Sequence, residues 1–303
     1  MALLIDEPAI HRRDAGVLRV TGADRQPYLH NLFSQHLQDA APGTVADFLY
    51  LDAKGNAMAE GRAVVTAGAV VLVTPAAVTP GLADALARFT FLLDAATEDL
   101  SDSWAVASVR GPGPVDVLGA RSEPMSAVPR DDGFVVRDRS GGVDIVGPAG
   151  WVDEQIDACA LPLADADAWE AWRVGAGIPG WGTEIAEGRR PQELGLLPTH
   201  VHLRKGCYPG QESIAKIYNL GRPRRALAVL EMTGPVRPGD AVAVDGKTGE
   251  VTSAAPAGQA WVALALVPVG ADGGVLGDGG VVVGEVTGRV RRRVGAELPV
   301  PGA

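Results

Sequence analysis

The chain has few cysteines, few aromatic residues and no long apolar run. Its 303 residues include two cysteines, which exclude a disulfide framework and are too few to hold an iron–sulfur cluster alone. No apolar stretch approaches the ~20 residues of a membrane-spanning helix. The N-terminal segment carries acids where a signal peptide has a basic start, and neither a Walker loop nor a dinucleotide-binding glycine fingerprint occurs. We therefore predict a cytoplasmic protein with no membrane partner.

The charge is strongly acidic overall but uneven along the chain. A formal net charge of −10 repels nucleic acid and anionic membranes, so nucleic acid is not an expected partner. Between His200 and Arg225 the only acid is Glu212, whereas cations are frequent: Arg204, Lys205, Lys216, Arg222, Arg224 and Arg225. This basic island indicates a small anionic ligand or a local anionic contact, or else a solvated face paired with acids elsewhere.

Two local patterns occur twice in the first 160 residues. A half-buried strand, a glycine and a helix follow one another from residues 16–21, and the same order returns from residues 104–109, with the second helix expected at residues 115–118. A strand that runs through a proline into a helix occurs at residues 70–78 and again at residues 144–152. The chain therefore resembles two copies of one α+β unit, and such a pair commonly leaves a ligand-binding cleft between its halves.

The final quarter of the chain has a different character. From about Ala226, short β-rich runs alternate with glycine and proline, which is typical of a small β-barrel, and residues 221–223 are the expected boundary. The predicted fold class is α+β, with two similar, duplicated α+β subdomains and a C-terminal β-barrel. The predicted domains are residues 1–100 for the first half, 101–225 for the second half and 226–303 for the barrel.

Two segments place polar and aromatic side chains on a common face. Residues 48–65 form a predicted β-hairpin, and Glu60 and Arg62 lie on one face of its second strand because they are two residues apart. Residues 165–176 form a predicted helix that puts Trp169 and Arg173 on one face. Trp169 is either a core anchor or one wall of a site for a flat ligand.

The stretch Arg204–Glu212, RKGCYPGQE, surrounds the more unusual of the two cysteines. Nearby cations favour the thiolate, which is the reactive form, and Gly206 and Gly210 let the backbone bend tightly. Three interpretations of Cys207 are open. It is a small buried residue, a metal ligand in the pattern H-x-H-x4-C with His200 and His202, or a reactive thiol beside a bound cofactor.

The same stretch resembles the K-G-C-[YF]-x-G-Q-E signature of the YgfZ family. These folate-binding proteins are linked to iron–sulfur cluster maintenance and are relatives of the glycine-cleavage T-protein, a tetrahydrofolate-dependent aminomethyltransferase. Further matches follow in the same order along the chain: Asp52–Gly55, Ala176–Pro179, Pro191-Gln192, Gly221 with Arg225, and Gly249–Ser253. The resemblance covers nearly the whole chain.

The resemblance implies a fold arranged around a central channel that holds tetrahydrofolate or a derivative. It implies that Trp169 contacts the folate and that Cys207 is the catalytic or cluster-contacting residue. Glu60 corresponds to one of the paired aspartates of the T-protein, and charge alone suggests Arg62, Arg173 or the basic island for the folate carboxylates. The implied partners are folate and iron–sulfur client proteins, with no resident metal. The signature loop comprises Lys205, Gly206, Tyr208, Gly210, Gln211 and Glu212.

Two departures from the family pattern shape the functional prediction. Gly175 stands where a family glutamate hydrogen-bonds the pterin, and Lys216 stands where arginine is usual. The leading prediction is a tetrahydrofolate-binding protein of iron–sulfur cluster assembly or repair, with Cys207 next to the folate channel. One alternative is a folate-dependent one-carbon (aminomethyl or methyl) transferase that uses Glu60 as a base. Another is a tRNA-modification-associated module with a weak contact at the basic island and at the cluster of Arg289 and residues 291–293. The sequence leaves open whether the protein is an enzyme.

Overall fold

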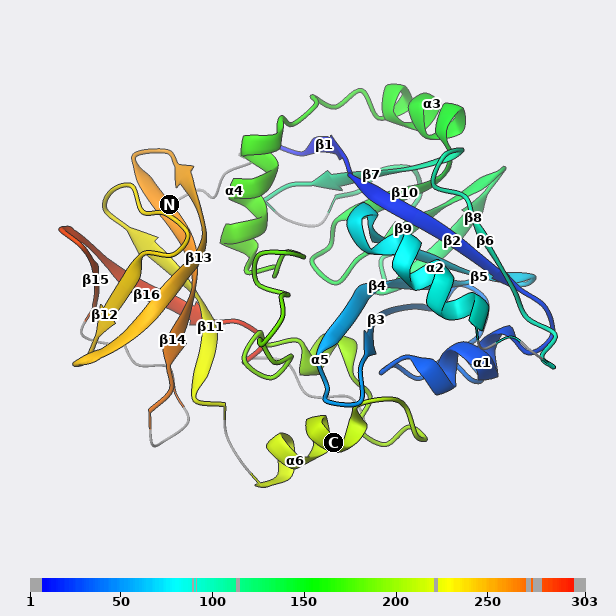
Figure 1. Ribbon diagram of the computed structural model, residues 1–303. Helices are drawn as coiled ribbons and strands as arrows, with labels where there is room; N and C mark the ends of the chain where they lie inside the picture. Colours follow the sequence, from blue (N-terminus) through cyan, green and yellow to red (C-terminus); the bar gives the residue numbers. More distant parts are fainter. Residues whose placement is uncertain are drawn as a thin grey trace.

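The computed structural model describes residues 7–88, 90, 92–112, 115–220, 223–270, 274 and 280–296. Figure 1 shows two β-sheets with their helices on one side of the molecule, a β-barrel on the other, and a segment of short helices and irregular loops between and below them. Two residues of the expected boundary, 221 and 222, lie outside the described residues. Within the described ranges, no helix is both long enough and apolar enough to cross a membrane.

The first sheet has five strands in the order β3-β4-β5-β2-β6, each antiparallel to its neighbours. Their bounds are β2 (Ala15–Thr21), β3 (Val45–Leu51), β4 (Ala57–Val65), β5 (Ala69–Pro75) and β6 (Ala96–Asp99). Three helical segments accompany them: α1 (Arg25–Leu32), the short 3-10 helix η1 (Ala76–Val78) and α2 (Thr79–Arg88). Leu29, Leu82 and Leu86 from the helices join Phe48 and Leu72 from the strands in one buried core.

The predicted hairpin is confirmed as β3 and β4. The Asp52 carboxylate accepts hydrogen bonds of 2.8 Å from the backbone N–H groups of Lys54 and Asn56, which closes the turn. Gly55 has a φ of 79°, a conformation that glycine adopts without steric cost. The same turn contacts the signature loop at Gly210.

The second sheet has the order β1-β7-β10-β9-β8. Its bounds are β1 (Ala9–Arg12), β7 (Trp104–Arg110), β8 (Ser126–Arg130), β9 (Gly133–Arg137) and β10 (Val143–Pro148), and α3 (Ala149–Cys159) packs on it. A Cβ at Gly133 would lie 2.4 Å from the Trp151 ring, so the glycine lets this indole reach the sheet. Cys159 is partly buried against the same core, as expected for a small apolar residue.

The duplication is confirmed by the order of the strands. In each half, one strand, β2 or β7, is followed by a three-stranded meander whose last strand, β5 or β10, pairs with it. That last strand runs through a proline, Pro75 or Pro148, into a helix. The two sheets share a buried core in which Val17 and Val73 meet Phe134 and Val146. Strand β1 comes before the first half in the sequence but belongs to the second sheet, because Ile10 pairs with Val109.

The prediction of a helix at residues 115–118 is wrong. This segment has no regular structure and enters a turn in which Leu118 and Gly119 have φ values of 52° and 57°. The backbone N–H of Val115 donates to the Gly141 carbonyl, and the Val115 carbonyl accepts a hydrogen bond from Arg137. These backbone groups bond to the β9–β10 region instead of forming helical turns.

The segment between the second sheet and the barrel contains three helices, α4 (Ala166–Ala176), α5 (Leu197–His200) and α6 (Gln211–Leu220). Asp165 caps α4 by accepting a 2.7 Å hydrogen bond from the N–H of Ala168. Gly177 follows the helix with a φ of 69°, a usual way for a helix to end. Helix α4 packs against β13 and β14 of the barrel and thereby connects the barrel to the two halves.

The predicted barrel is confirmed as a closed barrel with strand order β11-β14-β13-β12-β15-β16. Its bounds are β11 (Arg225–Met232), β12 (Ala241–Val244), β13 (Lys247–Ala257), β14 (Ala260–Pro268), β15 (Val281–Val283) and β16 (Val286–Arg293). Small and branched side chains such as Ala228, Val242 and Ala265 fill its interior. Of the glycine-rich residues 271–280, only Gly274 and Gly280 are described.

Candidate functional site

A cavity of about 940 Å³ lies where the two halves, α4, α5 and the end of the barrel meet. His11 and Arg110 come from the second sheet, Glu60 and Arg62 from the first, and the end of β16 closes part of the wall. The volume is within the range of about 300–1,000 Å³ that is usual for ligand sites. Seven arginines but only four carboxylates line the cavity, in a chain whose net charge is −10: Arg13, Arg62, Arg110, Arg139, Arg173, Arg292, Arg293, Asp14, Asp47, Glu60 and Asp138.

One wall of the cavity is aromatic. Helix α4 supplies Trp169 and Trp172, whose ring centroids are 5.0 Å apart, and β1 supplies His11, which stacks on Trp169 at 4.5 Å with an interplanar angle of 12°. The Arg110 guanidinium lies 5.8 Å from one indole centroid and 5.3 Å from the other, within cation–π range of both. The wall is therefore held in place before any ligand arrives. Burial lowers the pKa of His11, and its hydrogen bond to the Ala164 carbonyl opposes this effect.

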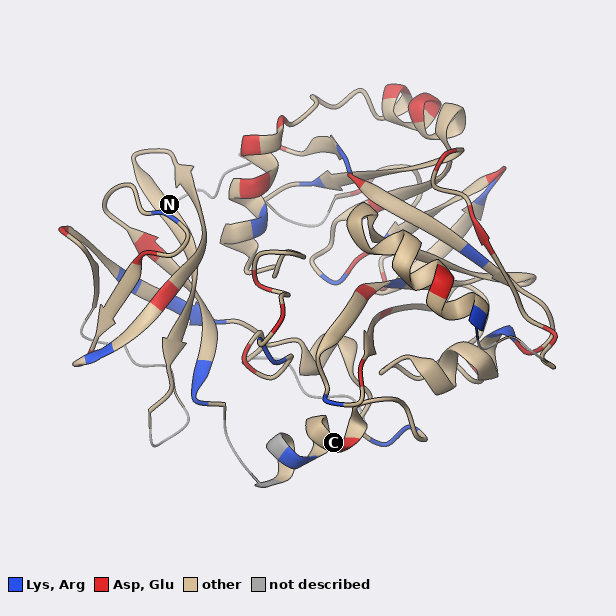
Figure 2. Ribbon diagram, viewed as in Figure 1, with Lys and Arg blue, Asp and Glu red and all other residues tan. Residues whose placement is uncertain are grey.

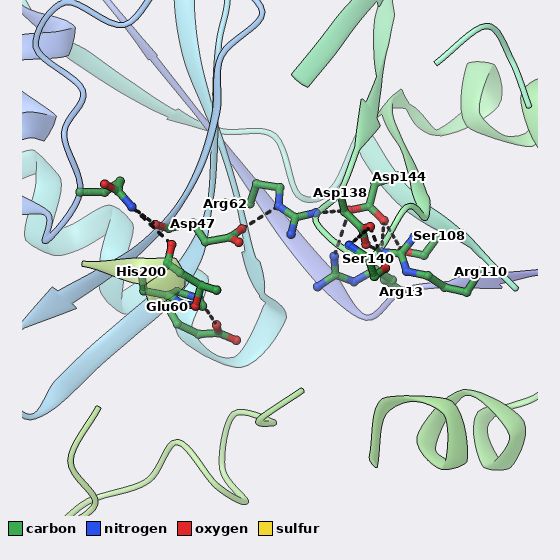
Figure 3. Close-up of polar contacts among 12 residues, drawn as sticks. Arg13, Asp47, Glu60, Arg62, Ser108, Arg110, Asp138, Ser140, Asp144 and His200 are labelled. Atoms are coloured by element: carbon green, nitrogen blue, oxygen red, sulfur yellow. Dashed lines mark hydrogen bonds and ion pairs between the residues drawn. The ribbon is translucent and has the colours of Figure 1, made fainter. Parts of the chain in front are cut away.

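A buried network of ion pairs forms the floor beside this wall (Figure 3). Asp144 accepts hydrogen bonds of 2.7 Å from Arg62 and Arg110, and a 2.6 Å bond from the Ser108 hydroxyl. Arg62 also donates to Asp47 over 2.8 Å. Because Asp47 and Arg62 come from the first sheet while Asp144 and Arg110 come from the second, the network ties the two halves together across the cavity.

Arg173 lines the cavity but has no donor to spare. Its five N–H groups face five acceptors: both oxygens of Glu170 at 2.5 and 2.7 Å, Glu184 at 3.0 Å, the Ile178 carbonyl at 2.6 Å and the Ser253 hydroxyl at 2.8 Å. Burial acts to raise the pKa of Glu184, but Arg173 and the surrounding hydrogen bonds hold it below its ordinary value. Arg173 therefore joins α4 to β13, and it does not offer a free fork to a ligand carboxylate.

The signature loop is anchored by its lysine. The Lys205 ammonium donates to the backbone carbonyls of His30 and Phe33 and lies 4.7 Å from the centre of the Tyr208 ring. Burial lowers the pKa of Lys205 to about 8, against an opposing effect of Cys207, so the two groups are near enough to interact electrostatically. Tyr208 is itself buried in the core that joins α6 to the barrel. The lysine thus holds the loop on the first half of the protein.

Cys207 is exposed and does not belong to the cavity lining. The expectation that its thiol opens onto the central cavity is therefore not met, because the loop folds over the outside of α1 and the β3–β4 hairpin. The basic island is also divided: Lys205 is buried and Arg225 lies 3.6 Å from Glu193, while Arg204 and Lys216 are exposed. Figure 2 shows cations of the hairpin turn, the signature loop and α6 at one end of the molecule.

Three separate motifs of the sequence meet around this loop. A Cβ at Gly210 would lie 2.5 Å from the Asp52 carbonyl, so the loop and the hairpin turn are in backbone contact. Arg190 donates to the Lys54 carbonyl, and Gln192 donates to the Ile214 carbonyl over 3.3 Å. Gln211 and Glu212 begin α6.

The metal interpretation gains no support from the geometry. His200 points into the cavity while Cys207 is exposed on the outside, so the H-x-H-x4-C pattern is spread over two surfaces. Throughout the described part of the chain, no three histidine, cysteine or acidic side chains are grouped so that they could hold a metal ion.

The sequence and the fold were compared with those of known proteins. No protein-family model matches the chain. The solved structure of the glycine cleavage system aminomethyltransferase T from Bartonella henselae aligns over 95% of this chain and 85% of its own, with a TM-score of 0.78 and 18% identity. The chain therefore has an aminomethyltransferase-like fold.

The curated relatives agree with that assignment. The chain is 22% identical over 243 residues to the tRNA-modifying protein YgfZ of Colwellia psychrerythraea, covering 76% of this chain and 73% of that protein. It is 34% identical over 112 residues to the mitochondrial iron–sulfur cluster assembly factor IBA57 of Mus musculus, covering 35% of this chain. A putative chloroplastic transferase of Arabidopsis thaliana is 24% identical over 78% of this chain. The chain spans 59% of the plant protein and 31% of the mouse protein.

The structure brings together part of the predicted site and separates the rest. Trp169, Arg173, Glu60 and Arg62 all line the cavity, whereas Cys207 and the other signature residues lie outside its lining. Sequence reasoning did not assign several lining residues to the cavity: His11, Arg13, Arg110, Arg139 and the end of β16. Alternation could have pointed only to His11 and Arg110, which lie on β1 and β7.

Proposed function

We propose that the protein binds a reduced folate in the central cavity and acts in iron–sulfur cluster assembly or repair, with Cys207 as an externally presented reactive thiol. The observation that carries this proposal is the cavity itself, a pre-formed aromatic wall beside an excess of arginines in an acidic chain. The relatives named YgfZ and IBA57 supply the iron–sulfur context. Client proteins are the partners that this role requires.

The lining suits the chemistry of a folate. A pteridine or aminobenzoyl ring is flat and gains apolar burial and ring contact against an indole, and the glutamate end is anionic. Because one face of Trp169 is covered by His11, the ligand ring would contact the indole pair on the side that is open to the cavity.

The cations that suit the glutamate carboxylates differ from those expected from the sequence. Arg173 is saturated and Arg62 already bonds to two carboxylates. Arg13 makes only a 3.9 Å approach to Asp144 among the described residues, and Arg139 is exposed at the rim. We assign the carboxylate contacts to Arg13 and Arg139.

Titration calorimetry with tetrahydrofolate tests the binding step. Wild-type protein should bind with micromolar or better affinity, and Trp169→Ala should weaken binding about tenfold or more, since a stacked ring contributes roughly 1–1.5 kcal/mol beyond its area. Absence of heat with the wild-type protein would overturn the proposal.

The variant Cys207→Ala tests whether the function requires the thiol. Because the residue lies outside the cavity, the variant should keep its folate affinity and its fold, while losing the ability to restore iron–sulfur enzyme activity in cells that lack a YgfZ-type protein. Full restoration would remove the thiol from the function.

A second candidate, folate-dependent one-carbon transfer, is favoured by one observation, the carboxylate of Glu60 inside the cavity. Turnover of a methylamine donor with tetrahydrofolate, lost in Glu60→Gln, would support it. The tRNA-associated alternative receives less support, because Arg289 and Arg291 pair with Glu231 and Arg292 donates to the Ala176 carbonyl.

A further inference from the structure

The two glycines of the signature loop differ in what requires them. Gly210 has a φ of 77°, and a Cβ on it would lie 2.5 Å from the Asp52 carbonyl oxygen, so the fold itself demands a glycine there. Gly206 does not have a positive φ, and among the described residues its Cβ would meet one atom within 4 Å, His30 Nε2 at 3.7 Å. That distance is an ordinary van der Waals contact. Neither the backbone nor the packing therefore requires glycine at position 206, and the absence of a side chain leaves the space in front of His30 Nε2 open.

His30 is buried in the last turn of α1, and the backbone orients its ring. The residue is 3% exposed. Nδ1 accepts hydrogen bonds of 3.2 and 3.3 Å from the N–H groups of Leu37 and Gln38, so the proton of the neutral ring is on Nε2. The ring of His36 packs at right angles to it, with centroids 4.8 Å apart. His30 therefore directs a fixed N–H donor toward Gly206.

This donor has no hydrogen-bond acceptor among the described residues. Burial, together with the charge of Lys205, lowers the pKa of His30 to about 4, so the ring stays neutral and Nε2 keeps its proton at neutral pH. The polar groups of buried side chains are normally hydrogen-bonded. An unpaired donor of a buried ring that faces an open space thus indicates a place for a ligand.

The space lies between a buried cation and the residue that carries the thiol. Cys207 follows Gly206 directly and is exposed. Lys205 precedes Gly206, donates to the His30 carbonyl, and lies within electrostatic range of both Cys207 and His30. A directed N–H donor and an ammonium charge both favour an anionic acceptor. An anion bound here would lie beside Cys207.

We propose that His30, Lys205 and the open space at Gly206 form a subsite for the carboxylate of a small molecule that approaches the Cys207 thiol. The inference rests on the proposed role of Cys207 as an externally presented thiol, and it does not depend on folate in the cavity. One donor, directed at a gap that a single methyl group would fill, suits one carboxylate oxygen, whereas a phosphate has more acceptors than this donor can satisfy. Gly206 contributes by leaving the donor accessible.

Paired alkylation of Cys207 tests the subsite. Iodoacetate and iodoacetamide are of nearly equal size and both react with the thiolate, but only iodoacetate carries a carboxylate, so the ratio of their rate constants cancels the thiolate fraction. The rates are measured on the full chain at pH 7 by mass spectrometry of the peptide that contains Cys207. We expect the ratio of the iodoacetate to the iodoacetamide rate to fall at least about fivefold in two variants. Gly206→Ala covers Nε2 with a methyl group, and His30→Asn keeps an acceptor for the two N–H groups but has no donor at the position of Nε2.

The chain supplies two controls. Cys159 packs against the core of the second sheet, so its ratio of rates should be the same in the wild type and in both variants. Gly81→Ala is the matched glycine variant, because Gly81 also lacks a positive φ and has nothing within 4 Å of an added Cβ, and its ratio at Cys207 should equal that of the wild type.

The outcomes separate this inference from the proposed function. An unchanged ratio at Cys207 in Gly206→Ala overturns the inference and leaves the proposed function standing. A fall that folded His30→Asn does not share also overturns it, because the donor is then not the cause. If wild-type Cys207 reacts with neither reagent, the externally presented thiol is overturned as well. Should urea unfolding show that His30→Asn is unfolded, Gly206→Ala decides the result, because its methyl group makes only an ordinary contact.

Discussion

Replacing Asp144 with asparagine should weaken the contact between the two halves more than any other single polar substitution near the cavity. The carboxylate bonds to Arg62, Arg110 and Ser108 and is almost fully buried. Breaking a buried ion pair from one side costs about 3–5 kcal/mol, because the partner charges remain buried. The folded state would lose a factor of roughly 10²–10⁴ in its equilibrium with the unfolded state.

Urea unfolding at pH 7 measures this cost. With a urea dependence of about 2–3 kcal/mol per molar, the midpoint should fall by about 1–2 M. Asp39→Asn removes a carboxylate from an exposed pair with His36 and is the matched control, for which we expect an unchanged midpoint. Equal midpoints for Asp144→Asn and the wild type would refute the claim that the network holds the halves together.

The pH dependence gives a second check with a defined sign. Burial acts to raise the pKa of Asp144, but Arg110, Arg62 and Arg13 hold it well below the ordinary value of 3.8. A carboxyl whose pKa is lower in the folded than in the unfolded state stabilises the fold above its unfolded pKa, and this stabilisation is lost as the pH falls through the folded pKa. The difference between wild type and variant should therefore be constant from neutrality to about pH 5 and shrink in more acidic solution.

The remaining predictions concern the signature loop. Gly210→Ala should cost about 3 kcal/mol or more in urea unfolding, since the φ of 77° is unfavourable and the new Cβ would meet the Asp52 carbonyl, whereas Gly239→Ala, with a φ of 91° and nothing within 4 Å, should cost only about 1–2 kcal/mol. Equal losses of unfolding free energy in the two variants would mean that Gly210 is not in close contact with the hairpin turn. Lys205→Met should abolish a rise in stability between pH 8 and 10.5: burial lowers the pKa of Lys205 from 10.5 to about 8, so the unfolded chain binds more protons in this window and stability increases with pH. A wild-type stability that runs parallel to that of the variant across this window would contradict the buried position of the ammonium.

Local signals in the sequence predicted the elements whose cause is local. Alternation of apolar residues located β2 and β7, the Asp52 turn located the hairpin, and Asp165 located the start of α4. The repeated order of strand, proline and helix was enough to predict the duplication. The helix expected at residues 115–118 failed because the bonds that decide it come from Gly141 and Arg137, more than twenty residues away.

The cavity was predictable only in part for the same reason. Glu60 and Arg62 were placed on one face by strand geometry, and Trp169 by helix geometry and family resemblance. The stack of His11 on Trp169 depends on the pairing of Ile10 with Val109, a contact between distant parts of the chain that no spacing reveals. Likewise, the sequence places a cation beside Cys207 but does not show that Lys205 turns inward to the carbonyls of residues 30 and 33.

The positions of the cavity and the thiol constrain how the two could cooperate. Thr199 and His200 line the cavity, and only seven residues later the same segment presents Cys207 to solvent. The stretch between them is fixed to the first half by three hydrogen bonds, from Ser34 to the His200 carbonyl, from the His202 N–H to the Ser34 carbonyl and from Lys205 to the Phe33 carbonyl. A ligand that contacts His200 and a client that contacts Cys207 would therefore occupy separate surfaces joined by one short, anchored segment. Direct attack of this sulfur on a cavity-bound ring would require that segment to leave its anchors, so a folate bound in the cavity would influence the thiol through the protein and not by direct contact.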